Sequence, residues 1–203
     1  MNYKKTPETW SKNVILADGD YIDRVAFDLI VNFERMLERR IPQADLARWI
    51  DCVALDGGMR PKEEQETTQV ILLHSKPKLE NFAPADYKDL DGKAFKDSLG
   101  EFCISCVPVE EMTTMENLFS ESLQHISQQQ EVKCLIVVGD ERYYDRIRHI
   151  LQKPEIKDKS LEATVFTMQP MAGGRFNQEI LGFSLMAAMG IKSAELTEVR
   201  GEW

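Results

Sequence analysis

Short apolar runs alternate with amphipathic segments along most of this chain. Apolar side chains in those segments recur every three or four residues, the spacing of a helix that buries one face. The expected strands are 13–17, 67–74, 101–109, 132–138 and 163–168, and the expected helices are about 25–37, 46–53, 92–99, 115–126, 144–151 and 176–189. Because parallel strands need helical crossovers, we predict an α/β fold, a three-layer sandwich with a largely parallel sheet.

The 203 residues are expected to form a single α/β domain. Its core spans about 13–168 and is followed by a C-terminal helix at about 176–189, while 190–203 has no assignment. The prolines and scattered charges of 75–90 predict an irregular connection. No apolar stretch is long enough for a membrane span, and 1–7 lacks the apolar core of a secretory signal, so we expect a cytoplasmic protein without membrane contact.

Charge and cysteine usage argue against non-specific nucleic-acid or membrane binding and against a zinc or redox site. The formal net charge of −9 disfavours non-specific binding to nucleic acid or anionic membranes. Cys103 and Cys106 form a Cys-x-x-Cys pair, but three residues apart on a strand their side chains face opposite ways. We therefore expect reduced thiols rather than a zinc or redox site.

Two acidic turns directly follow apolar runs. The first is Asp18-Gly19-Asp20 and the second is Gly139-Asp140-Glu141. Ligands of open α/β sheets bind at the carboxyl ends of strands, where the strand order reverses. If the first and fourth expected strands are neighbours there, Asp18, Asp20 and Asp140 form a catalytic group, with Asp18 and Asp140 as ligands of Mg²⁺ or Mn²⁺. The same residue types also suit plain turns and helix caps.

A basic run follows the second acidic turn. On a helix, Arg142, Arg146 and His149 would share a face near the carboxylates, where they could bind a phosphate. A solvated face that pairs with Glu141 and Asp145 is the alternative interpretation.

The two acidic turns and their strands resemble those of NYN domains in the PIN-like nuclease superfamily. The opening strand through Asp20 resembles the first strand of that family, and 135–143 resembles its later Ser-Gly-Asp-x-Asp-Phe strand. The resemblance implies a three-layer sandwich and Mg²⁺-dependent ribonuclease activity on RNA phosphodiesters, with Asp18 and Asp140 matching metal aspartates. Arg142 stands where the family has its second aspartate, and the family's intervening Lys and Asp have no clean match.

Two alternatives therefore stay open. Asp18-Gly19-Asp20, Gly139-Asp140 with Asp145, and Ser75 after a strand also resemble haloacid-dehalogenase-type phosphatases, which would make Asp18 a nucleophile. The other alternative is a non-catalytic binding or assembly domain with a degenerate acidic site. Such a domain could form a homodimer or bind a protein partner through its C-terminal helix, which is apolar on more than one face.

Overall fold

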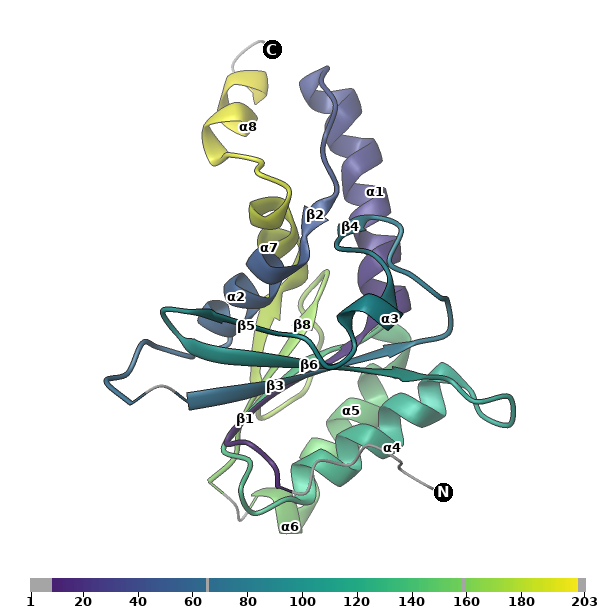
Figure 1. Cartoon of the computed structure of the whole chain (residues 1–203), viewed down its shortest axis with the longest axis vertical. Coiled ribbons are helices and arrows are strands. Elements are labelled where there is room, and N and C mark those ends of the chain that lie inside the picture. The colour runs from purple at the N-terminus through teal and green to yellow at the C-terminus, as the bar shows by residue number, and fades with distance from the viewer. Residues whose placement is uncertain (1–8, 65, 158–159, 201–203) are drawn as a thin grey trace.

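A seven-stranded sheet forms the centre of the structure, a computed structural model that describes residues 9–64, 66–157 and 160–200 (Figure 1). Its strands are β1 (Asn13–Asp18), β3 (Glu66–His74), β5 (Ala94–Asp97), β6 (Gly100–Pro108), β7 (Cys134–Val138), β8 (Glu162–Thr167) and β9 (Asn177–Ile180). The strand order is β5-β6-β3-β1-β7-β8-β9, and every neighbouring pair is parallel except β5 with β6. The predicted α/β class with a largely parallel sheet is confirmed.

Helices cover both faces of this sheet and complete the three layers (Figure 1). They are α1 (Gly19–Leu37), α2 (Leu46–Asp56), α3 (Tyr87–Leu90), α4 (Met115–Gln128), α5 (Tyr144–Leu151), α6 (Pro154–Lys157), α7 (Leu181–Ala188) and α8 (Ser193–Arg200), with a 3-10 turn η1 (Glu141–Tyr143). A two-stranded ribbon of β2 (Ala44–Asp45) and β4 (Phe82–Ala83) lies apart from the main sheet.

The side chains of β1 show how the sheet builds two cores. Ile15 and Ala17 pack in the core that α1, α2 and α7 share, whereas Val14 and Leu16 pack against α4 and α5. All four side chains are fully buried. Successive side chains of a strand alternate between faces, so a strand covered on both sides needs an unbroken apolar run.

The strand order reverses between β1 and β7. From β1 the chain moves to β3 and then β6 on one side, and it later adds β7, β8 and β9 on the other side. The predicted neighbourhood of the first and fourth expected strands is confirmed, with Ala17 opposite Val138. Ligands of such sheets usually bind outside the carboxyl ends of the strands at this reversal. We name this end of β1 and β7, with the acidic turns that follow the two strands, the acidic crevice.

Three local predictions were wrong. The expected helix at 92–99 is the strand β5, which pairs antiparallel with β6 and stacks Phe95 on Phe102 at 4.9 Å. The expected helix at 176–189 begins only at Leu181, because 177–180 pairs with β8 as an edge strand. The connection at 75–90 holds β4 and the short helix α3 rather than an irregular path throughout. Strand pairing overrode the local helix pattern in the first two cases.

The cysteines lie in the core or at its margin and carry no disulfide. Cys106 is buried and Cys103 is half-buried on opposite faces of β6, and none of the four cysteines forms a disulfide bond. Residues 1–7, from which no secretory signal was expected, lie outside the described residues, as do 201–203. Within the described part of the chain, no helix combines the length and the apolar character that crossing a membrane requires.

Candidate functional site

Asp18 is the last residue of β1 and the N-cap of α1. Its Oδ1 atom accepts a hydrogen bond from the backbone N–H of Tyr21 at 3.0 Å, and only 2% of the residue is exposed. Burial, together with the nearby charges of Asp20 and Asp140, raises the pKa of Asp18 to about 6 against the opposing Tyr21 hydrogen bond. The end of β1 therefore holds a carboxyl group whose charged form is disfavoured by its buried surroundings.

Asp20 lies two residues further along and contacts the residue that follows β3. Its carboxylate accepts hydrogen bonds from the backbone N–H of Ser75 at 3.1 Å and from the Ser75 hydroxyl. Ser75 directly follows β3, so these contacts join the carboxyl ends of two neighbouring strands. Ser75 thus lies beside the first acidic turn.

Asp140 follows β7 and is held by two arginines. Its Oδ1 accepts from the backbone N–H and the Nε of Arg142 at 2.9 and 3.0 Å. Its Oδ2 accepts from Arg24 Nη2 at 2.7 Å and Arg142 Nη2 at 2.8 Å. Burial would raise the pKa of Asp140, but the arginine hydrogen bonds outweigh it and lower that pKa to about 2.

Glu141 joins three elements of the crevice, although we expected it only as a turn residue or as a partner of the basic run. Its Oε1 accepts from the Tyr21 hydroxyl of α1 at 2.5 Å and from the Met168 backbone N–H after β8 at 2.8 Å. Arg24 was also missed, because its contact with Asp140 spans 116 residues of sequence. Helical spacing alone places Arg24 on the polar side of α1, which is weak evidence for such a role.

The three basic residues expected to share one face have separate environments. Arg142 contacts Asp140, whereas Arg146 pairs with Glu116 of α4 at 2.9 Å and also donates to Asn117. His149 lines a hollow with Arg148 and Gly173 instead. The structure therefore brings only Arg142 of this group onto the acidic turns, and a phosphate-binding role for the other two stays a prediction.

The crevice can be tested for its fit to a divalent cation. Among the described residues, no three His, Cys, Asp or Glu side chains stand together in a metal-ligating arrangement. Hard cations nevertheless take oxygen ligands, and Asp18, Asp20, Asp140 and Glu141 outnumber the two guanidinium groups of Arg24 and Arg142. These carboxylates supply the oxygen atoms that a hard cation prefers, but Asp140 is held by two arginines and Glu141 by Tyr21 and Met168, so a cation at this site stays a prediction.

Fold and site together define a doubly wound α/β protein with an acidic crevice at its strand-order reversal. The chain belongs to a family of unknown function, DUF6621, whose model matches residues 7–196. No curated protein and no solved structure matches the chain. Its function must therefore be argued from the site itself.

Proposed function

We propose that this protein hydrolyses RNA phosphodiesters at the acidic crevice with the help of Mg²⁺ or Mn²⁺. One observation carries the proposal: two turns more than a hundred residues apart deliver Asp18 and Asp140 to the same end of neighbouring parallel strands. Asp20 extends the carboxylate group toward β3. The resemblance to PIN-like NYN domains gives the same assignment of Asp18 and Asp140.

Electrostatics supports a cation partner for Asp18. Its raised pKa comes from burial and from like charges, and both disfavour the charged carboxylate. The positive charge of a bound divalent cation would favour that charged form. In this proposal Asp18 and Asp140 are the principal ligands and Asp20 is in support. When bound, the cation supplies positive charge that polarises the phosphoryl group.

Arg142 has a second role in the proposal. Its side chain is 71% exposed although its guanidinium lies on Asp140, so it reaches both the carboxylate and the solvent. If the Asp140 carboxylate binds a cation instead of Arg142, the Arg142 guanidinium can bind the substrate phosphate through paired N–H donors. Arg24, which is half exposed on α1, can make the same exchange from the other side.

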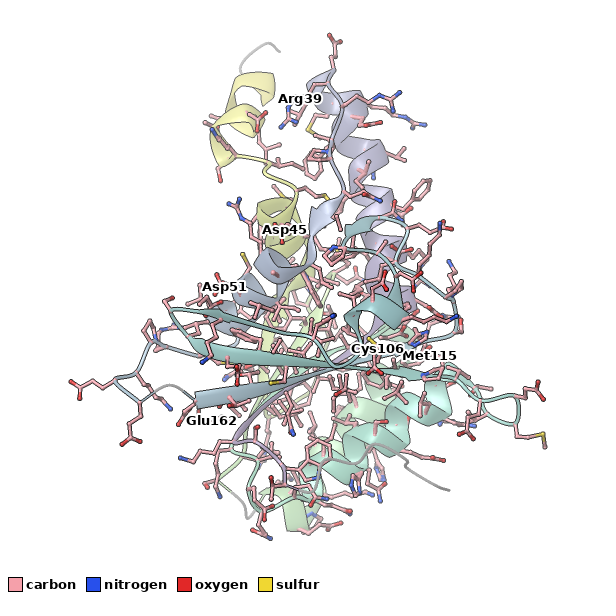
Figure 2. All side chains as sticks on the ribbon, viewed as in Figure 1. Arg39, Asp45, Asp51, Cys106, Met115 and Glu162 are labelled. Carbon is pink, nitrogen blue, oxygen red and sulfur yellow. The ribbon has the colours of Figure 1, made fainter. Side chains whose placement is uncertain are left out.

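Cleavage of an end-labelled single-stranded RNA in the presence of Mg²⁺ or Mn²⁺ tests the proposal. We expect cleavage by the wild-type chain, none in EDTA, and at least a hundredfold loss in Asp18→Asn. Asp45→Asn is the matched control, because Asp45 caps α2 in the same way but lies outside the crevice (Figure 2). Equal cleavage by wild type and Asp18→Asn would reject the assignment, and turnover of a phosphomonoester alone would favour the dehalogenase-type phosphatase.

A catalytically silent binding domain is the second candidate, and the arginine pair on Asp140 favours it. Four hydrogen bonds from two arginines already satisfy both oxygens of this carboxylate. In this case neither Mg²⁺ nor Mn²⁺ raises the melting temperature of the wild-type chain, since a ligand that binds the folded state must stabilise it. A homodimer or a protein partner would then use α7, which forms part of the helix expected at about 176–189 and where Phe183 is 66% exposed, and size measurements on dilution would show self-association.

A further inference from the structure

A second concave region lies away from the acidic crevice, between α5 and the loop that follows β8. This hollow of about 640 Å³ is lined by Asp145, Arg148, His149, Gln152, Gly173, Gly174 and Arg175. None of the residues that hold Asp18, Asp20 or Asp140 lines it. It is therefore a separate candidate site.

Two glycines let the backbone of this loop approach its neighbours closely. Gly173 has φ +74°, and a Cβ atom there would lie 3.0 Å from Nη1 of Arg148. A Cβ atom on Gly174 would lie 2.6 Å from the ring of Phe176. The loop thus packs its main chain directly against a guanidinium group, a contact that a side chain at position 173 would disturb.

The cations of the hollow are incompletely neutralised. Arg148 pairs with Asp145 at 2.9 Å, and the Asp145 side chain is 86% exposed. Arg175 is exposed, and among the described residues no hydrogen bond or ion pair engages its side chain. In a chain of net charge −9, this places two guanidinium groups and the His149 imidazole around one carboxylate.

A second hollow, which we call the slot, adjoins the first and shares Gln152 and Arg175 with it. The slot has a volume of about 390 Å³, and its walls combine Leu151, Leu161 and Phe176 with the polar side chains of Lys157, Glu162 and Asn177. Glu162 stands at the start of β8 (Figure 2). One end of the combined surface therefore carries two guanidinium groups, and the other end combines an aromatic ring and leucines with polar side chains.

We propose that the hollow and the slot together bind a nucleoside monophosphate group, either as a free nucleotide or as the phosphorylated end of an RNA. Arg148 and Arg175 hold the phosphate by charge-assisted hydrogen bonds, beside the glycine loop. The attached ring lies in the slot, where Phe176 offers a face or edge for stacking. This proposal needs no divalent cation and does not depend on the acidic crevice.

Calorimetric titrations in EDTA test this site. The probes are AMP, adenosine, and a short RNA with either a 5′-phosphate or a 5′-hydroxyl. We expect binding that requires the phosphate, and a loss of affinity of about tenfold or more in Arg175→Ala. Gly173→Ala should also weaken binding, whereas Arg35→Ala, an exposed arginine on α1, should leave it unchanged.

Each outcome bears on the proposal. Tighter binding of AMP identifies a free nucleotide as the ligand, and tighter binding of the phosphorylated RNA identifies an RNA end. The proposal is overturned if adenosine binds as well as AMP, if Arg175→Ala binds like wild type, or if no probe binds at several millimolar. Asp18→Asn must bind as wild type does, so this result is independent of the proposed hydrolysis.

Discussion

Asp18 caps a helix with a carboxylate whose charge its surroundings disfavour. Its hydrogen bond to the Tyr21 N–H stabilises the first turn of α1, but burial raises its pKa to about 6. A carboxylate with a raised folded-state pKa binds its proton more tightly in the folded chain than in the unfolded one. Its contribution to stability is therefore fully present below about pH 3.8 and is lost as the pH rises through about 6.

Asp18→Asn should stabilise the protein at neutral pH. Asparagine keeps the cap, and it removes a charge that costs up to about 3 kcal/mol at pH 7 for a pKa raised from 3.8 to about 6. We expect a higher free energy of unfolding in urea at about pH 7.5, and a much smaller gain at about pH 4.5, with EDTA present throughout. The same substitution is expected to abolish activity, a trade of stability against function that is common at such sites.

Asp45→Asn supplies the comparison for this measurement. Asp45 accepts from the backbone N–H of Arg48 at 3.0 Å, so it caps α2 as Asp18 caps α1, but it is exposed. Its replacement should change stability by a few tenths of a kcal/mol at either pH. An equal pH dependence of stability in wild type and Asp18→Asn would contradict the assigned environment of Asp18.

The first turn of α1 can lie so close to β3 and α3 only because residue 19 is glycine. A Cβ atom there would lie 2.1 Å from the Tyr87 hydroxyl and 2.9 Å from the Leu73 carbonyl oxygen. Both neighbours are buried, and the carbonyl belongs to the backbone of a central strand. The spacing of Asp18 and Asp20 around the crevice therefore depends on the missing side chain.

Gly19→Ala should destabilise the protein by about 1–3 kcal/mol, since overpacking forces backbone and side chains to shift. Gly182→Ala, in α7, is the matched substitution, because its Cβ atom would meet only Met168 at 3.5 Å, an ordinary contact. There, the helix preference for alanine should give about 0.5–1 kcal/mol of added stability. Urea unfolding of both variants measures the difference, and an equal effect of the two would show that α1 does not pack this closely.

Elements with strong internal patterns were predictable, and elements defined by distant pairing were not. The apolar run of β1 and the helical spacing in α1 each predicted their own structure, because burial on one or two faces leaves a periodic pattern. The segment of β5 was expected to be a helix from its local sequence, and its strand structure comes from pairing with β6. Edge strand β9 is only four residues long and directly precedes the apolar helix α7, so the sequence assigned it to that helix. Its strand structure comes from pairing with β8.

At the scale of the whole molecule, the positions of the two acidic turns depend on the strand order of the sheet rather than on local sequence. The sequence interpretation assumed that β1 and β7 are neighbours, which the rule on crossover connections permits, and the strand order bears this assumption out. The contacts of Arg24 with Asp140 and of Tyr21 with Glu141 could not be predicted. They link residues more than a hundred positions apart through side-chain directions that periodicity does not specify.

The titration of the Asp18 carboxyl, followed by carbon-13 NMR with and without Mg²⁺, examines the proposed cation site most directly. Without the cation we expect a pKa of about 6. With saturating Mg²⁺ we expect that pKa to fall below the ordinary value of 3.8, because the cation favours the charged carboxylate. An Asp18 pKa that stays near 6 at every Mg²⁺ concentration would contradict the assignment of this crevice as a cation-dependent hydrolytic site.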